Sequence, residues 1–187
     1  VKYIDKIITL GLPTPANYLF LLMAGFYFLL LTLGVDRRVA IMGAIGFAFS
    51  SYFLIFIGTG HNSKAHAIGY MAPVIAGIIM TYRGRILLGA SITGLALALE
   101  LYANHLQITY YLMMITVLLG GVFLYEAIIG KKLKDFAKAS ALLIVVAGLA
   151  VASNITNLWA TQEYGEHSTR GPSELTADKA NLTSGLD

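Results

Sequence analysis

The chain has 187 residues, of which 57% are hydrophobic and only 12% are charged, and its mean hydropathy is +0.73. This composition excludes a soluble globular domain, because a water-exposed surface needs more charged residues than this. Thirteen Lys and Arg against ten Asp and Glu give a net charge of +3, but no basic tract interleaved with aromatic residues indicates nucleic-acid binding. We therefore predict an all-α fold, a polytopic bundle of transmembrane helices in a lipid bilayer.

The first 15 residues form a short amphipathic segment. Three isoleucines fall on one helical face and Asp5 on the other, which predicts an interfacial helix. We assign residues 1–15 to this helix and the loop that follows it. A helix docked on the protein surface would have the same pattern. Thr14 followed by Pro15 predicts an N-cap and first turn for the next helix.

Six apolar stretches follow, each near the length of roughly 20 residues that a membrane span needs. They predict a six-span bundle over residues 16–159 and an extracytoplasmic tail at 160–187 that begins a further region. Both chain ends look cut, so we expect an internal piece of a larger membrane enzyme. The predicted spans are 16–34, 39–57, 67–82, 86–102, 108–129 and 139–159.

Two features within these spans concern packing. Ala40, Ala44 and Ala48 are four residues apart, which predicts a face that lets a neighbouring helix approach closely. Pro73 is expected to bend the third span.

Basic residues occupy alternate loops between the predicted spans. The positive-inside rule places those loops in the cytoplasm of a multi-pass protein of the bacterial inner membrane. The remaining loops, the N-terminal helix and the tail then share the outer face, so both ends are predicted to be extracytoplasmic. The basic residues are Arg37, Arg38, Arg83, Arg85, Lys131, Lys132, Lys134 and Lys138.

All four histidines fall in predicted outer segments, and two of them lie in the loop 58–66. Its glycines and its donors His61, Asn62, Lys64 and His66 resemble an anion-binding loop in composition. The two histidines are five residues apart without a flanking carboxylate, which argues against a metal site. Simple loop polarity, with Lys64 extending its ammonium to the membrane surface, is the structural alternative.

Glu100 lies within the fourth predicted span, where an ionisable side chain is costly unless it faces protein or water. With Asn104 and Gln107 it would form an i, i+4, i+7 line if the helix continues that far, which predicts the polar wall of an outward cavity. Two structural roles for Glu100 also remain open. It could be partially hydrated near the lipid headgroups, or it could tie two helices together.

Three stretches carry a resemblance to a known family. They are Gly-His-Asn-Ser-Lys-Ala-His at 60–66, Tyr-Ala-Asn-His-Leu-Gln-Ile-Thr-Tyr-Tyr at 102–111 and Glu-Tyr-Gly-Glu-His-Ser-Thr-Arg-Gly at 163–171. Together they resemble the YfhO-like bacterial membrane proteins, especially the Bacteroidetes type. That family is similar to the GT-C class of integral-membrane glycosyltransferases.

The resemblance implies transfer of a sugar from a polyprenyl-phosphate donor to a cell-envelope acceptor on the outer membrane face. Glu100 is the candidate catalytic residue, although the acid of GT-C enzymes usually lies in a first outer loop that this chain lacks, apart from the helix around Asp5. No cofactor is predicted, and a divalent cation would be compatible. The predicted substrate-binding residues are His61, Asn62, Lys64, His66, Asn104, His105, Gln107 and Arg170.

Two other functions remain open. A transporter or flippase could use the polar line at Glu100 for a permeant, and inverted repeats would favour it, but the sequence contains no obvious repeat. A noncatalytic membrane scaffold would use the outer polar loops as docking surfaces.

Overall fold

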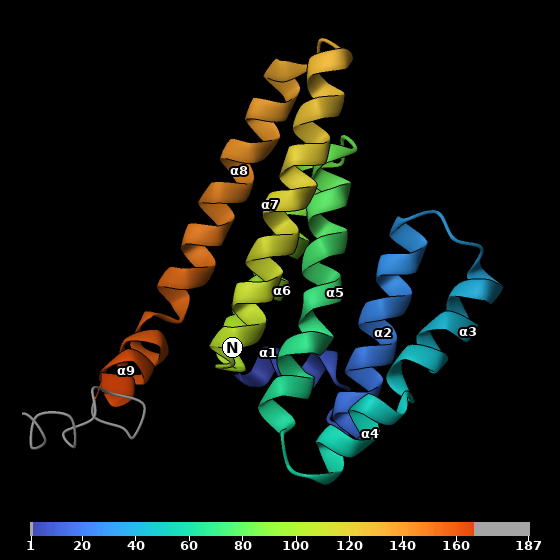
Figure 1. Cartoon of the computed structure of the whole chain (residues 1–187), viewed down its shortest axis with the longest axis vertical. Coiled ribbons are helices and arrows are strands. Elements are labelled where there is room, and N and C mark those ends of the chain that lie inside the picture. Colours follow the sequence, from blue (N-terminus) through green and yellow to red (C-terminus); the bar gives the residue numbers. More distant parts are fainter. Residues whose placement is uncertain (1, 167–187) are drawn as a thin grey trace, which may run out of the picture. The chain divides into compact units, whose positions relative to one another are not determined.

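The structure, a computed structural model, describes residues 2–166, and that part of the chain contains helices and no strands. The chain divides into two units, Val1–Asn154 and Ile155–Asp187. The first unit contains α1 to α8, and the second contains α9 (Figure 1). The helices are α1 Lys2–Ile8, α2 Ala16–Thr32, α3 Arg37–Ala48, α4 Ser51–Gly58, α5 Asn62–Tyr82, α6 Ile86–Tyr102, α7 Leu106–Ile129, α8 Leu133–Ser153 and α9 Ile155–Glu166.

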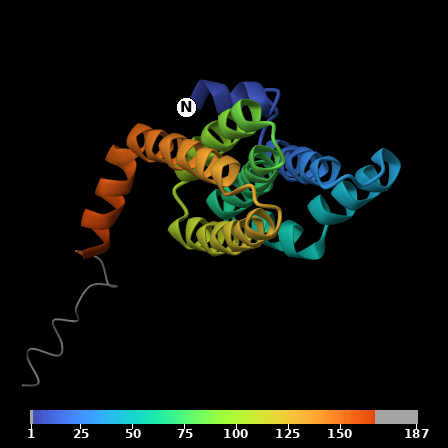
Figure 2. The same ribbon diagram turned by 90° about the horizontal axis from the view of Figure 1, so that it is seen from above.

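Helix α5 is the central helix of the first unit. It contacts α2, α4, α6, α7 and α8, and most of its length is buried (Figure 2). Pro73 lies inside this helix, and the bend expected there stays a prediction. The core therefore follows α5, with α2 and α3 on one side of it and α6 and α8 on another.

Helices α5 and α6 cross with their backbones in contact. A Cβ atom added at Gly89 of α6 would lie 2.5 Å from the Thr81 amide nitrogen and 2.6 Å from the Gly77 carbonyl oxygen of α5. The Thr81 and Thr93 hydroxyls donate to the carbonyls of Gly77 and Gly89 in their own helices, at 2.8 and 2.9 Å. Small residues with internally bonded hydroxyls are the usual means of close helix packing in membranes.

Three helices, α5, α7 and α8, are long and apolar enough to cross a membrane. The pair α3 and α4, bent by 40°, would be a fourth span if it is counted as one broken span. Helices α2 and α6 are apolar but have only 17 residues each, the lower end of the usual length. The structure thus confirms an all-helical fold with three to four candidate spans, and a six-span bundle stays a prediction.

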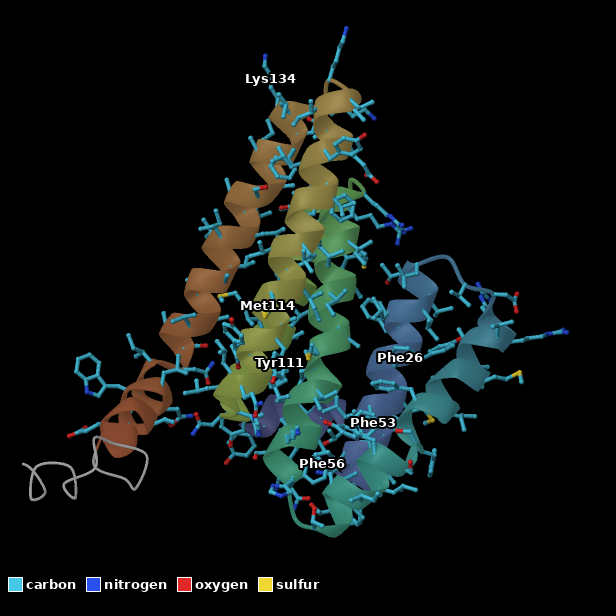
Figure 3. All side chains as sticks on the ribbon, viewed as in Figure 1. Phe26, Phe53, Phe56, Tyr111, Met114 and Lys134 are labelled. Atoms are coloured by element: carbon cyan, nitrogen blue, oxygen red, sulfur yellow. The ribbon has the colours of Figure 1, made fainter. Side chains whose placement is uncertain are left out.

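The outer surfaces of α7 and α8 are apolar. More than half of the surface is exposed for large apolar side chains such as Met113, Val117, Leu118, Ile144 and Leu149. Figure 3 labels Met114, next to Met113, on the same helix α7. A soluble monomer rarely exposes so much continuous apolar surface. Lipid is the solvent that these faces fit.

The predicted second span is corrected, because it consists of two helices. Ser50 adopts an extended backbone and precedes α4 as its N-cap residue. The bend brings the rings of Phe47 and Phe53 into edge-to-face contact at 4.9 Å, and Phe26 of α2 stacks on Phe47 at 4.2 Å. The predicted face of Ala40, Ala44 and Ala48 is confirmed as buried, in the helix that packs on α2.

Other predicted boundaries also shift. Helix α2 begins at Ala16 as expected, but Pro15 is its N-cap residue and no side chain caps it, so the capping prediction for Thr14 is wrong. The predicted sixth span at 139–159 is wrong at both ends, because α8 covers Leu133–Ser153. The buried Asn154 side chain donates to two backbone carbonyls at 3.0 Å each and ends that helix.

The turns of the first unit alternate between two ends. The turns after α2, α5 and α7 lie on the upper side in Figure 1, with the basic residues, and we call this side the basic end. Helix α1 and the turns after α4 and α6, at residues 59–61 and 103–105, lie on the opposite side, which we call the histidine end. Eight of the eleven basic residues among residues 2–166 lie at or near the basic end, and Lys2, Lys6 and Lys64 lie at the histidine end.

Candidate functional site

A carboxylate, an imidazole and a phenol meet at the histidine end. Asp5 Oδ1 lies 2.7 Å from His66 Nε2 and accepts a hydrogen bond from the Tyr70 hydroxyl at 2.7 Å. The side chains of Asp5 and His66 are 16% and 12% exposed, so both are mostly buried but not fully enclosed. The Tyr70 side chain is buried behind them.

The helices explain why these groups meet. His66 and Tyr70 are one turn apart on α5 and share a face. Ile8 anchors α1 by packing on the buried cluster that contains Tyr70, and this presents Asp5 to α5. Ile7 remains exposed, so α1 packs on the bundle through Ile8 and presents an apolar side chain to its surroundings.

Sequence reasoning missed this cluster, because 61 residues separate Asp5 from His66. His66 is a predicted substrate-binding residue, and the helix around Asp5 is named only as the exception to the missing outer loop. Tyr70 is not among the predicted site residues. The i, i+4 spacing of His66 and Tyr70 was the available signal.

His61 and Lys64 lie beside the aromatic residues of α4. The Lys64 ammonium lies 4.0 Å from the centre of the Phe56 ring and 5.6 Å from that of Tyr52, and the His61 ring meets Phe56 edge-on at 5.7 Å (Figure 3). Cation–π contact holds the lysine near the surface. The prediction that 62–66 belongs to a loop is wrong, because α5 begins at Asn62.

His105, in the turn between α6 and α7, belongs to the same neighbourhood. Burial lowers the pKa of His105, and the nearby Lys64 and His61 lower the pKa further, while a backbone hydrogen bond opposes them. Each of the lowering effects disfavours the charged ring, and the Nδ1 atom of His105 is buried without a hydrogen-bond partner. The side-chain oxygen of Asn62 is buried without a partner as well. Buried polar atoms without a partner are uncommon in folded proteins.

The predicted line from Glu100 through Asn104 to Gln107 does not form. Helix α6 ends at Tyr102, and Asn104 adopts a left-handed backbone with φ of +53°, so the chain turns away. The Gln107 side chain instead donates to the Tyr111 hydroxyl at 2.8 Å in the first turn of α7. Arg170 lies outside the described residues.

Glu100 is fully buried, at 0% exposure. Its carboxylate accepts hydrogen bonds from the Thr109 hydroxyl at 3.0 and 3.2 Å. This contact joins α6 to α7, as expected of a glutamate that ties two helices together. A catalytic role for Glu100 stays a prediction, and the geometry favours the structural role.

No family model, curated protein or solved structure matches the chain. The resemblance to the YfhO-like proteins therefore stays a prediction.

The described residues offer no ready metal site. Within residues 2–166, no group of three or more His, Asp or Glu side chains could hold a metal ion. The histidine end contains a partly exposed carboxylate held by an imidazole, with a lysine and two more histidines at the same end.

Proposed function

We propose that the chain is part of a membrane glycosyltransferase that moves a sugar from a polyprenyl-phosphate donor to a cell-envelope acceptor. The observation that carries the proposal is the partly exposed Asp5 carboxylate, held by His66 at the end of the bundle that also contains His61, Lys64 and His105. A lipid-linked phosphate lies at the membrane surface, where cations must meet it while the sugar reaches an aqueous site. The resemblance points to the same activity.

The proposed chemistry uses Asp5 as general base. The acceptor hydroxyl oxygen attacks the sugar carbon attached to phosphate, its proton goes to Asp5, and the carbon–oxygen bond to phosphate breaks. The polyprenyl phosphate leaves with the electron pair of that bond. His66 and Tyr70 both bond to Oδ1 of Asp5 and fix the orientation of the carboxylate. Lys64 attracts the negative phosphate.

Replacing Lys64 with alanine is the test of the phosphate site. We expect polyprenyl-phosphate binding by the purified protein in lipid to weaken by about 1 to 3 kcal/mol, because a charge-assisted contact is lost. Lys131→Ala removes an exposed lysine at the basic end and should leave binding unchanged. Equal binding by wild type and both variants would contradict a phosphate site at Lys64.

The proposal includes an orientation and six spans, formed by α2, α3 with α4, α5, α6, α7 and α8. The histidine end faces outward because the basic end follows the positive-inside rule. The chain has no cysteine, so single cysteines introduced at Ser63, Arg83 and Lys132 are unambiguous labels. We expect an impermeant thiol reagent to label Ser63→Cys in intact cells and to reach the other two only after lysis. The reverse pattern would overturn the orientation.

A further inference from the structure

The basic end contains a cavity that the proposed transferase site does not use. It has a volume of about 480 Å³ and lies where α5 and α7 end and α6 and α8 begin. Its wall includes the ring of Tyr82, which stacks on Phe123 at 4.7 Å and on Phe136 at 5.3 Å. The volume falls within the range of small-molecule sites in proteins.

The charges around this cavity are balanced. Glu126 and Asp135 supply two carboxylates, and Arg83 and Lys132 supply two cations. The Arg83 guanidinium donates to the Thr32 carbonyl of α2 at 2.8 Å, so Lys132 is the cation better placed to bind a ligand. A ligand with only negative charge would be opposed by the two carboxylates, whereas a ligand with both charges matches the lining.

A second cavity of about 510 Å³ lies between α5, α6, α7 and α8, and its lining is almost entirely apolar. It opens onto the exposed apolar surface, because Met113, Val117 and Ile144 belong to both. Tyr82 lines both cavities, and the Tyr82 hydroxyl bonds at 3.0 Å to Ser140, which also lines the second. Along α8 the lining extends from Ser140 to Val151, roughly 16 Å at about 1.5 Å per residue. That is about half of a hydrocarbon core of roughly 30 Å.

We propose that these two cavities bind one phospholipid with an ethanolamine headgroup. The phosphate contacts Lys132, the primary ammonium donates hydrogen bonds to Glu126 and Asp135, and one acyl chain occupies the apolar cavity beyond Tyr82. A choline headgroup has no N–H donor for the carboxylates. The Tyr82 ring, which already stacks on two phenylalanines, is poorly placed to compensate through cation–π contact.

The test measures lipid retained by the purified protein. The protein is exchanged into detergent with equal amounts of ethanolamine, choline and glycerol phospholipids of the same chains, washed, and analysed by native mass spectrometry. We expect one ethanolamine lipid per chain, favoured by about tenfold or more over the others, since charged hydrogen bonds distinguish them. Retention of no lipid, or equal retention of all three, would overturn the proposal.

Two pairs of variants locate the lipid. Ala147→Trp fills the apolar cavity and should abolish retention, whereas Val145→Trp, on the exposed side of α8, should not. Lys132→Gln should weaken retention about tenfold, whereas Lys131→Gln, in the same turn but outside the cavity, should not. If Ala147→Trp impairs folding as judged by circular dichroism, Ala147→Leu replaces it. Equal retention within both pairs would show that the lipid binds elsewhere.

Discussion

Replacing Gly89 with alanine is expected to destabilise the bundle, although alanine is the better helix former. The added Cβ would lie 2.5 Å from the Thr81 amide nitrogen and 2.6 Å from the Gly77 carbonyl oxygen. Both are backbone atoms, which cannot rotate away as a side chain could, so α5 and α6 must separate. Overpacking of this kind costs about 1 to 3 kcal/mol. The stability is lost from the packing of α5 against α6, the pair of helices at the centre of the bundle.

The matched control is Gly121→Ala on α7, where an added Cβ meets nothing within 4 Å. There the substitution should be neutral or stabilise by up to about 1 kcal/mol, because glycine is the poorer helix former. Thermal unfolding in detergent measures both variants. The two should shift in opposite directions or by clearly different amounts, and equal shifts would contradict a tight crossing of α5 and α6.

Replacing Asp5 with asparagine is expected to reduce sugar transfer by roughly 10²- to 10⁴-fold, the usual contribution of a general base. The amide keeps the size of the side chain and can still bond to His66 and Tyr70, but it cannot accept the proton of the acceptor. Donor binding should change little, since Asp5 does not contact phosphate in the proposed mechanism. The measurements are turnover and donor affinity of the purified protein in lipid.

Glu100→Gln is the matched control, because it makes the same change in the other candidate carboxylate. Glu100 is fully buried against Thr109, so the variant should retain turnover and alter mainly thermal stability. Loss of turnover in Glu100→Gln with normal turnover in Asp5→Asn would reverse the assignment. Glu100 would then be the catalytic residue.

Patterns within single segments of the sequence predicted the helices and one buried helix face. Apolar runs predicted an all-helical membrane protein, and the four-residue spacing of Ala40, Ala44 and Ala48 predicted a buried face. The break between α3 and α4 was missed because the sequence is apolar on both sides of Ser50 and Ser51. Ser50, a common N-cap residue, was its signal.

Contacts between distant segments could not be predicted in the same way. Asp5 and His66 meet only because Ile8 docks α1 on the bundle, and nothing in either segment specifies that docking. The polar line from Glu100 to Gln107 failed because it assumed a continuous helix where Asn104 turns the chain. His61, Lys64 and His105 were grouped correctly at one end, since topology alone places their segments together.

Sugar transfer by the wild-type protein is the most direct test of the central claim. The full-length protein that contains this chain is purified and reconstituted in lipid with labelled polyprenyl-phosphate sugars and a cell-envelope acceptor fraction. The proposal predicts that label becomes covalently attached to the acceptor while polyprenyl phosphate is released. Movement of intact donor across the bilayer without attachment would indicate a flippase instead, and binding of donor with neither outcome would indicate a scaffold. Either result would contradict the assignment as a glycosyltransferase.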